Sequence, residues 1–95
     1  MSIVGTVKHQ PNDVQDYDID YSEWFPVDDV ITEAVIGCTP PMVMLPSYAI
    51  GPANVVKVWV YAGGVDGITH KITVRAITSD GREKEAELRV KIKEV

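Results

Sequence analysis

The stretch of sequence that decides the fold is residues 54–61, which read Asn-Val-Val-Lys-Val-Trp-Val-Tyr. Small apolar side chains alternate here with larger or charged ones, and this period of two is typical of a half-buried β-strand. Because the ammonium of Lys57 must reach water, we expect the valines to face the core and the other set to face outward. The two sets are Val56, Val58 and Val60, and Lys57, Trp59 and Tyr61.

Four further stretches also predict strands, namely residues 16–25, 30–37, 68–78 and 84–94. In the first of them, aspartates alternate with Tyr17, Ile19 and Tyr21 until Pro26 ends the run. An Asp80-Gly81 pair between the last two predicts a hairpin. Residues 42–45 form a short apolar run, and residues 47–53 are expected to be a connection.

No stretch has the period of 3.6 that a helix requires, and turn-forming residues separate the strands at short intervals. This pattern predicts an all-β fold, an Ig-like antiparallel β-sandwich of about seven strands. We expect residues 16–95 to form the sandwich. Residues 1–15, interrupted by Pro11-Asn12-Asp13, are expected to be an N-terminal arm or an edge segment.

The composition excludes several classes of protein. With 95 residues, the chain has the length of one domain, and its single cysteine excludes a disulfide framework. A net charge of −5 argues against nucleic acid as a partner. No apolar run is long enough for a membrane span, and the first residues do not resemble a signal peptide, so we expect no membrane partner.

The charge is unevenly distributed along the chain. Residues 1–50 contain eight carboxylates and one lysine, net −7, whereas residues 51–95 contain six acidic and eight basic residues, net +2. Such a division can orient identical subunits or a basic partner, although a solvated acidic surface also explains it.

Candidate catalytic, cofactor and metal sites are lacking in the sequence, and we expect no enzyme and no cofactor. Asp16, Asp18 and Asp20 have the spacing of a calcium loop, but Tyr21 stands where the loop needs glycine and Val27 where it needs glutamate. Two isolated histidines, His9 and His70, and the one cysteine, Cys38, cannot form a metal cluster. A nucleophilic Cys38 paired with His70 is formally possible, but a buried structural thiol is the favoured interpretation.

The remaining candidates are interface residues. If Trp59 and Tyr61 are exposed beside Lys57, they form an apolar patch suited to a protein or a sugar, unless a second layer covers them. Asp16, Asp18 and Asp20 are a second candidate, because their row of like charges either contacts a partner or protects a sheet edge. Trp24, which is next to Phe25, is expected to fill the core.

Two parts of the chain resemble a known family. Residues 16–25, Asp-Tyr-Asp-Ile-Asp-Tyr-Ser-Glu-Trp-Phe, are similar to the D-Y-x-I-D-W/Y-S-x-W-L opening of a family of tailed-phage proteins. Residues 58–64 followed by Gly67, and then residues 75–82, resemble its V-W-L-S-G-G-T-x-G and R-I-T-T-x-x-G-R segments. These proteins are called phage fibre-tail adaptors or phage Ig-like virion proteins, and the similarity extends over residues 8–94.

The resemblance implies a non-enzymatic structural protein of the virion that links tail or neck to fibre components through surfaces of a β-sandwich. Its partners would be other phage virion proteins of the tail, neck, fibre or capsid, together with further copies of itself in a homo-oligomer. It would be made in the cytoplasm of the bacterial host and reside in the virion. A capsid decoration protein and a small carbohydrate- or cell-surface-binding module remain the alternatives.

Overall fold

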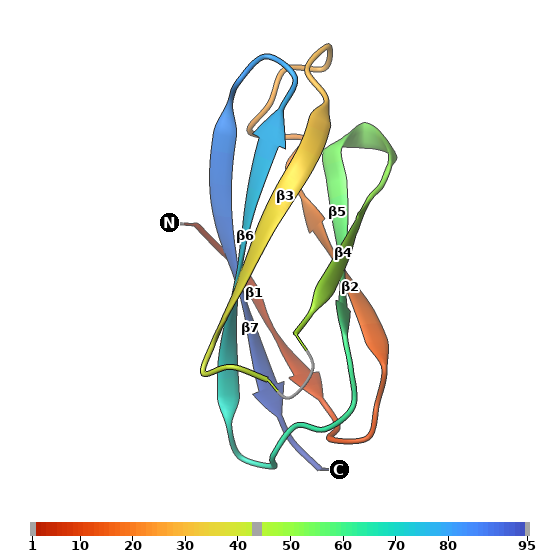
Figure 1. Ribbon diagram of the computed structural model, residues 1–95, viewed down its shortest axis with the longest axis vertical. Helices are drawn as coiled ribbons and strands as arrows, with labels where there is room; N and C mark the ends of the chain where they lie inside the picture. Colours follow the sequence, from red (N-terminus) through yellow and green to blue (C-terminus); the bar gives the residue numbers. More distant parts are fainter. Residues whose placement is uncertain (1, 43–44, 95) are drawn as a thin grey trace.

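The chain folds into seven strands arranged in two facing sheets, as a computed structural model of residues 2–42 and 45–94 shows (Figure 1). The strands are β1 (Ser2–His9), β2 (Gln15–Asp20), β3 (Ile31–Thr39), β4 (Ser47–Ile50), β5 (Val55–Val60), β6 (Thr69–Thr78) and β7 (Glu83–Ile92). The prediction of an all-β sandwich is therefore confirmed. No helix in the described part of the chain has the length and apolar character that a membrane span requires.

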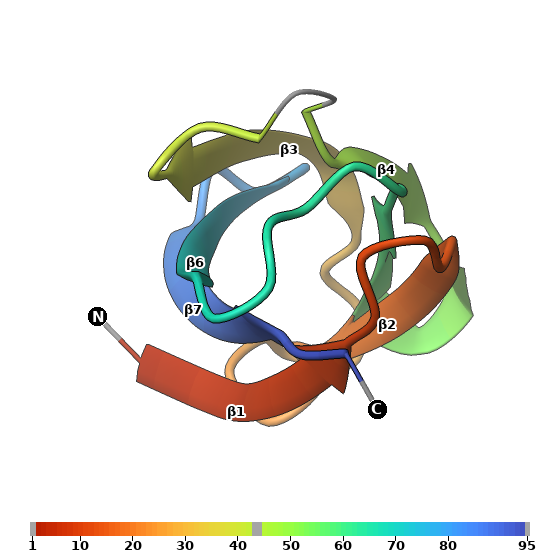
Figure 2. The same ribbon diagram turned by 90° about the horizontal axis from the view of Figure 1, so that it is seen from below.

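Four strands form one sheet in the order β1-β7-β6-β3, and three form the other in the order β2-β5-β4. Figure 2 shows the two layers end-on. The antiparallel pairing that the sequence predicts holds for the described strand pairs except one, because β1 runs parallel to β7. After β1 the chain crosses directly to the other sheet, so β1 cannot form a hairpin with β2 and instead pairs with the last strand.

The core lies between the sheets and follows the predicted alternation. Val56, Val58 and Val60 of β5 are fully buried, as expected, and they face the apolar side chains of β6 and β7. The residues on those two strands are Ile72, Val74, Ala76, Ala86, Leu88, Val90 and Ile92. Each large apolar side chain removed from water stabilises the fold by about 1.5–3 kcal/mol, so this double row accounts for much of the stability.

The strand predicted over residues 16–25 is shorter than expected, because β2 ends at Asp20. The Asp20 carboxylate accepts a hydrogen bond from the Ser22 amide at 2.8 Å, and the Trp24 amide donates to the Tyr21 carbonyl at 2.9 Å. These local bonds turn the backbone before Pro26 is reached. Tyr21 still faces the core, as the alternation predicts.

The prediction of a connection over residues 47–53 is wrong for the first half of that range. Ser47–Ile50 form the edge strand β4, which pairs with β5, and a 3-10 turn of Pro52–Asn54 joins the two. The strand has only four residues between Pro46 and Pro52, so its alternation is too short to recognise in the sequence. Part of the apolar run over residues 42–45 lies outside the described residues.

The hairpin predicted at Asp80-Gly81 is confirmed between β6 and β7. Gly81 has a φ of 88°, a left-handed conformation that glycine adopts without steric cost. The Thr78 amide donates to the Arg82 carbonyl at 2.9 Å and closes the turn. This hairpin lies at the upper end of the molecule in Figure 1.

Candidate interaction surfaces

The outer face of the three-stranded sheet brings the predicted interface residues together. The register places Asp16 opposite Trp59 and Asp18 opposite Lys57, with Asp20 further along the same face of β2. Tyr61 follows β5 directly at the lower end. All six candidates thus lie on or next to one surface.

Lys57 lies between two of the aspartates. Its Nζ atom is 2.6 Å from Asp16 Oδ2 and 3.2 Å from Asp18 Oδ1. Hydrogen bonds to Asp16 and Asp18 raise the pKa of Lys57, and the bond from Lys57 lowers the pKa of Asp16. The ammonium therefore occupies the position at which a cation would bind these carboxylates. Among the described residues, no three His, Cys, Asp or Glu side chains are grouped so that they could hold a metal ion.

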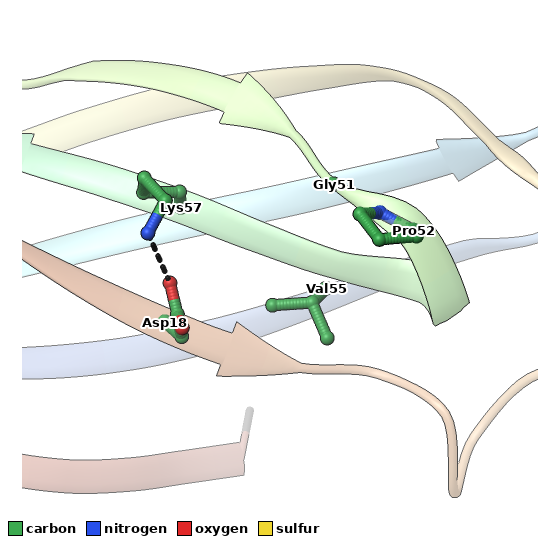
Figure 3. Close-up of a pocket in the computed structure, with 5 residues that line it drawn as sticks. All are labelled: Asp18, Gly51, Pro52, Val55 and Lys57. Carbon is green, nitrogen blue, oxygen red and sulfur yellow. Dashed lines mark hydrogen bonds and ion pairs between the residues drawn. The ribbon is translucent and has the colours of Figure 1, made fainter.

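A shallow hollow of about 290 Å³ lies next to this ion pair. It is lined by Asp18, Gly51, Pro52, Val55 and Lys57, and Figure 3 shows Lys57 reaching Asp18 beside Val55. The hollow is open and has a mainly apolar lining with one charged edge. It is large enough for a single side chain of a partner, and far too open to exclude water from a reaction.

Trp59 and Tyr61 are only partly exposed. Each is half-buried on the outer face, and the Tyr61 hydroxyl is hydrogen bonded to Ser47 Oγ on β4. Neither is among the large apolar residues that are exposed to water. A sugar- or protein-binding patch at these two residues stays a prediction, but the exposed apolar surface of the molecule lies elsewhere.

That exposed apolar surface is concentrated at the two ends of the sandwich. The upper end comprises the loops over residues 21–30, 51–54 and 79–82, and the lower end comprises residues 10–14, 45–46 and 61–68 (Figure 1). Exposed at the upper end are Trp24, Val27 and Val30; at the lower end Val14, Leu45, Val65 and Ile68; and along β3 and β4 Val35, Tyr48 and Ile50. Val27 is completely exposed, at 102 %.

The expectation that Trp24 fills the core is wrong, because this residue lies at the surface of the upper end. Its ring meets Tyr21 edge-on at a centroid distance of 5.4 Å, and Lys84 Nζ lies 5.0 Å above it. The residue is 36 % exposed, whereas Phe25 is buried and stacks on Tyr21. The ring covers the aromatic cluster on one side and leaves an apolar face toward solvent.

A buried carboxylate fixes the loops of the upper end to one another, and the sequence analysis missed it. Asp29 is 1 % exposed, and its carboxylate accepts bonds from Arg82 Nη1 at 2.8 Å and from Ser79 Oγ at 3.2 Å. Burial alone would raise the pKa of Asp29, but its hydrogen bonds outweigh burial and lower the pKa to about 2. The groups responsible are Thr78, Arg82, the Asp80 amide and Ser79.

Asn54 extends this network to the third loop of the upper end. Its side chain donates to the Asp29 carbonyl at 2.9 Å and accepts from the Ile31 amide at 3.1 Å. The backbone carbonyl of Asn54 accepts the Tyr21 amide at 2.9 Å. The upper end is therefore a preformed surface, because the polar groups of its loops bond to one another.

The lower end contains the histidines and the cysteine. His70 Nδ1 lies 2.6 Å from the Pro40 carbonyl oxygen, which can only accept, so this nitrogen carries the proton. Cys38 Sγ is 3.9 Å from the same nitrogen, which therefore cannot remove the thiol proton. Burial also raises the pKa of the Cys38 thiol. His9 is likewise engaged, with the Tyr17 hydroxyl and the Asp13 carbonyl each at 2.9 Å.

Comparison with known protein families gives one match that covers most of the chain. Residues 9–91 match the family model Gp77, described as podophage GP4 fiber-tail adaptor protein gp77. The matched region begins at the last residue of β1 and ends within β7. No curated protein gives a significant match to the chain.

Proposed function

The chain belongs to the Gp77 family of podophage fiber-tail adaptor proteins, and we propose that it joins its two partners through the two apolar ends of its sandwich. It is a structural component of the phage tail and binds other virion proteins. One end would hold the tail and the other the fibre. The observation that carries this proposal is the separation of exposed apolar side chains between opposite ends of a molecule 41 Å long.

Three features support this proposal. Apolar patches on an otherwise polar surface mark contacts with other proteins. The network around Asp29 holds the upper loops in place, so little order must be gained on binding. A sandwich also keeps its two loop surfaces at a fixed separation, which a connector between two rigid parts of a particle requires.

We also infer four finer points. The orders β7-β6-β3 and β2-β5-β4 correspond to the CFG and BED strands of an immunoglobulin domain, so the domain is Ig-like. The protonated His70 Nδ1 next to Cys38 supports a role without catalysis. The unpaired thiol of Cys38 suits synthesis in the reducing cytoplasm of the bacterial host. The tail role of the family favours an adaptor over a capsid decoration protein.

The two ends can be tested separately with Val27→Lys at the upper end and Val65→Lys at the lower end. Both side chains are exposed, at 102 % and 61 %, so neither change should unfold the protein. Particles assembled with each variant would be purified and their adaptor and fibre content measured. A variant of the end that binds the tail should lose adaptor and fibre together, whereas a variant of the other end should keep the adaptor and lose the fibre.

Val35→Lys on β3 is the matched control, because this valine is 46 % exposed but lies on the side of the molecule. It should leave both contents unchanged. If the two end variants assemble particles with the wild-type content of adaptor and fibre, the ends are not the binding surfaces.

A further inference from the structure

The outer face of the four-stranded sheet carries a cluster of basic side chains, which we call the basic block: Lys8, Lys71, Arg89 and Lys91. Register places Lys8 of β1 opposite Lys91 of β7, and Lys71 of β6 opposite Arg89 of β7. These strands are neighbours in the sheet, so the four charges form two adjacent rows in its lower half. Like charges directly opposite one another on a sheet are destabilising.

The basic block is only partly neutralised within the molecule. The Glu87 carboxylate accepts a hydrogen bond from Arg89 Nε at 2.7 Å, and it lies 4.0 Å from Lys71 Nζ. Its side chain is 5 % exposed, so it is committed to these two partners. Among the described residues, no carboxylate lies within ion-pairing distance of Lys8 or Lys91. An anionic partner would relieve the repulsion in this part of the sheet.

The outer face of the other sheet offers charges of the opposite sign with the same repeat. Asp16, Asp18 and Asp20 lie on one face of β2, and Lys57 compensates only part of their charge. Alternate residues on a strand are about 6.6–6.8 Å apart, and this distance also separates the two rows of the basic block. Two neighbouring carboxylates of β2 can therefore lie along the basic block, each close to one of its two rows.

The two outer faces point away from each other, as the end-on view shows (Figure 2). Within one molecule they cannot meet, so the complementary contact requires two molecules. We propose that the aspartate row of one copy docks on the basic block of the next copy, side by side. This side-by-side contact rests on the proposed adaptor function. It leaves both apolar ends of every copy free for the tail and the fibre.

Such a contact joins two different faces, so it repeats from copy to copy and produces a ring if the rotation closes. The sandwich measures 41 × 22 × 19 Å between Cα atoms, so one face offers on the order of 800 Å², which is what one partner buries in an ordinary interface. Because both surfaces are exposed and charged, the contact weakens as salt screens it, with a screening length of about 10 Å at 0.1 M.

Sedimentation velocity of the full chain tests the proposal. The wild type should associate at low salt and dissociate at high salt. Lys91→Glu and Asp18→Lys should each raise the dissociation constant by roughly tenfold or more, which corresponds to the loss of one or two close charge pairs. An equimolar mixture of the two variants should recover association, because each retains one native face and the reversed charges attract one another.

Two variants with the same kind of charge reversal serve as controls. Arg75→Glu lies on the same sheet face but outside the basic block, and Asp28→Lys lies in an upper loop. Both should associate as the wild type does, and circular dichroism should show that all variants are folded. A wild type that stays monomeric at low salt, or that associates equally well with either face reversed, would overturn the proposal.

The result of the self-association test can be distinguished from the result of the test of the adaptor function. Val27→Lys and Val65→Lys change the ends alone, so they should self-associate normally while they lose fibre or tail binding. If Lys91→Glu prevents incorporation into particles although the wild type does not self-associate, the basic block contacts a different virion protein, and the second copy is excluded as its occupant.

Discussion

Replacing Tyr21 by phenylalanine isolates one hydrogen bond that joins the two sheets. The Tyr21 side chain is fully buried, and its hydroxyl donates to the Val74 carbonyl on β6 at 2.7 Å. Burial raises the pKa of Tyr21, which favours the protonated hydroxyl that donates this bond. Tyr21→Phe removes this donor and leaves the ring stacked on Phe25 and in contact with Trp24.

The expected loss follows from that geometry. A buried intramolecular hydrogen bond contributes a net of about 0.5–1.5 kcal/mol, and an acceptor left without its donor in the core costs about 1–3 kcal/mol. No cavity larger than one oxygen atom is created, so the packing contribution is small. We therefore expect the free energy of unfolding to fall by about 1–2 kcal/mol, and Tm to fall by about 4–8 °C for each kcal/mol.

Urea unfolding followed by tryptophan fluorescence measures this change directly. Tyr48→Phe is the matched control, since Tyr48 is 40 % exposed on β4 and the same atom is removed in contact with water. It should shift the free energy of unfolding by less than about 0.5 kcal/mol. If Tyr21→Phe is as stable as this control, the bond to Val74 does not hold the sheets together.

Three further changes test the core, the hairpin and the upper end. Val58→Ala removes two buried methyl groups from a side chain with no exposed surface and should cost about 2 kcal/mol of unfolding free energy in a urea titration. Gly81→Ala forces a residue with a Cβ into a φ of 88°, and a calorimetric scan should show a loss of about 1–2 kcal/mol. The pKa of Asp29 is about 2 in the folded protein and about 3.9 in an unfolded chain, so the unfolded state binds more protons below pH 4. The contribution of Asp29 to the free energy of unfolding should therefore be complete above about pH 5 and be lost as the pH drops toward 2. Urea midpoints that stay constant over that interval would contradict the role given to Asp29.

The strands that dominate the core were predictable because their alternation is long. Val56, Val58 and Val60 repeat over a complete strand, and a shift of one residue would expose all of them. The Asp80-Gly81 pair fixed the last hairpin in the same way, through a turn that few other residues can form. In both cases the information is local, so it can be read from neighbouring residues.

The features that the sequence analysis missed depend on contacts between distant residues. Asp29 and Arg82 are separated by 53 positions, and Asp29 looks in the sequence like one more turn residue next to Asp28. The strand β4 has too few residues to show a pattern. Trp24 was misplaced because hydrophobicity predicts burial only on average, whereas the early end of β2 turns this ring outward.

The candidate site was predicted as a set of residues but not as a set of roles. Alternation alone places Lys57, Asp16 and Asp18 on one face, but only the register shows that the lysine lies between the two aspartates. That pairing changes the interpretation of the row, because the Lys57 ammonium already lies where a cation would bind Asp16 and Asp18. It leaves part of the negative charge to face a neighbour.

The distribution of polar and apolar surface explains how a domain this small can serve as a connector. Exposed apolar residues such as Val27 and Val65 lie at opposite ends, while the outer faces of both sheets are charged. Apolar contacts at the ends would be strong and insensitive to salt, whereas charged contacts at the sides orient neighbours but are weak when screened. Copies that meet through their sides can therefore adjust to one another during assembly before the ends fix them to the tail and the fibre.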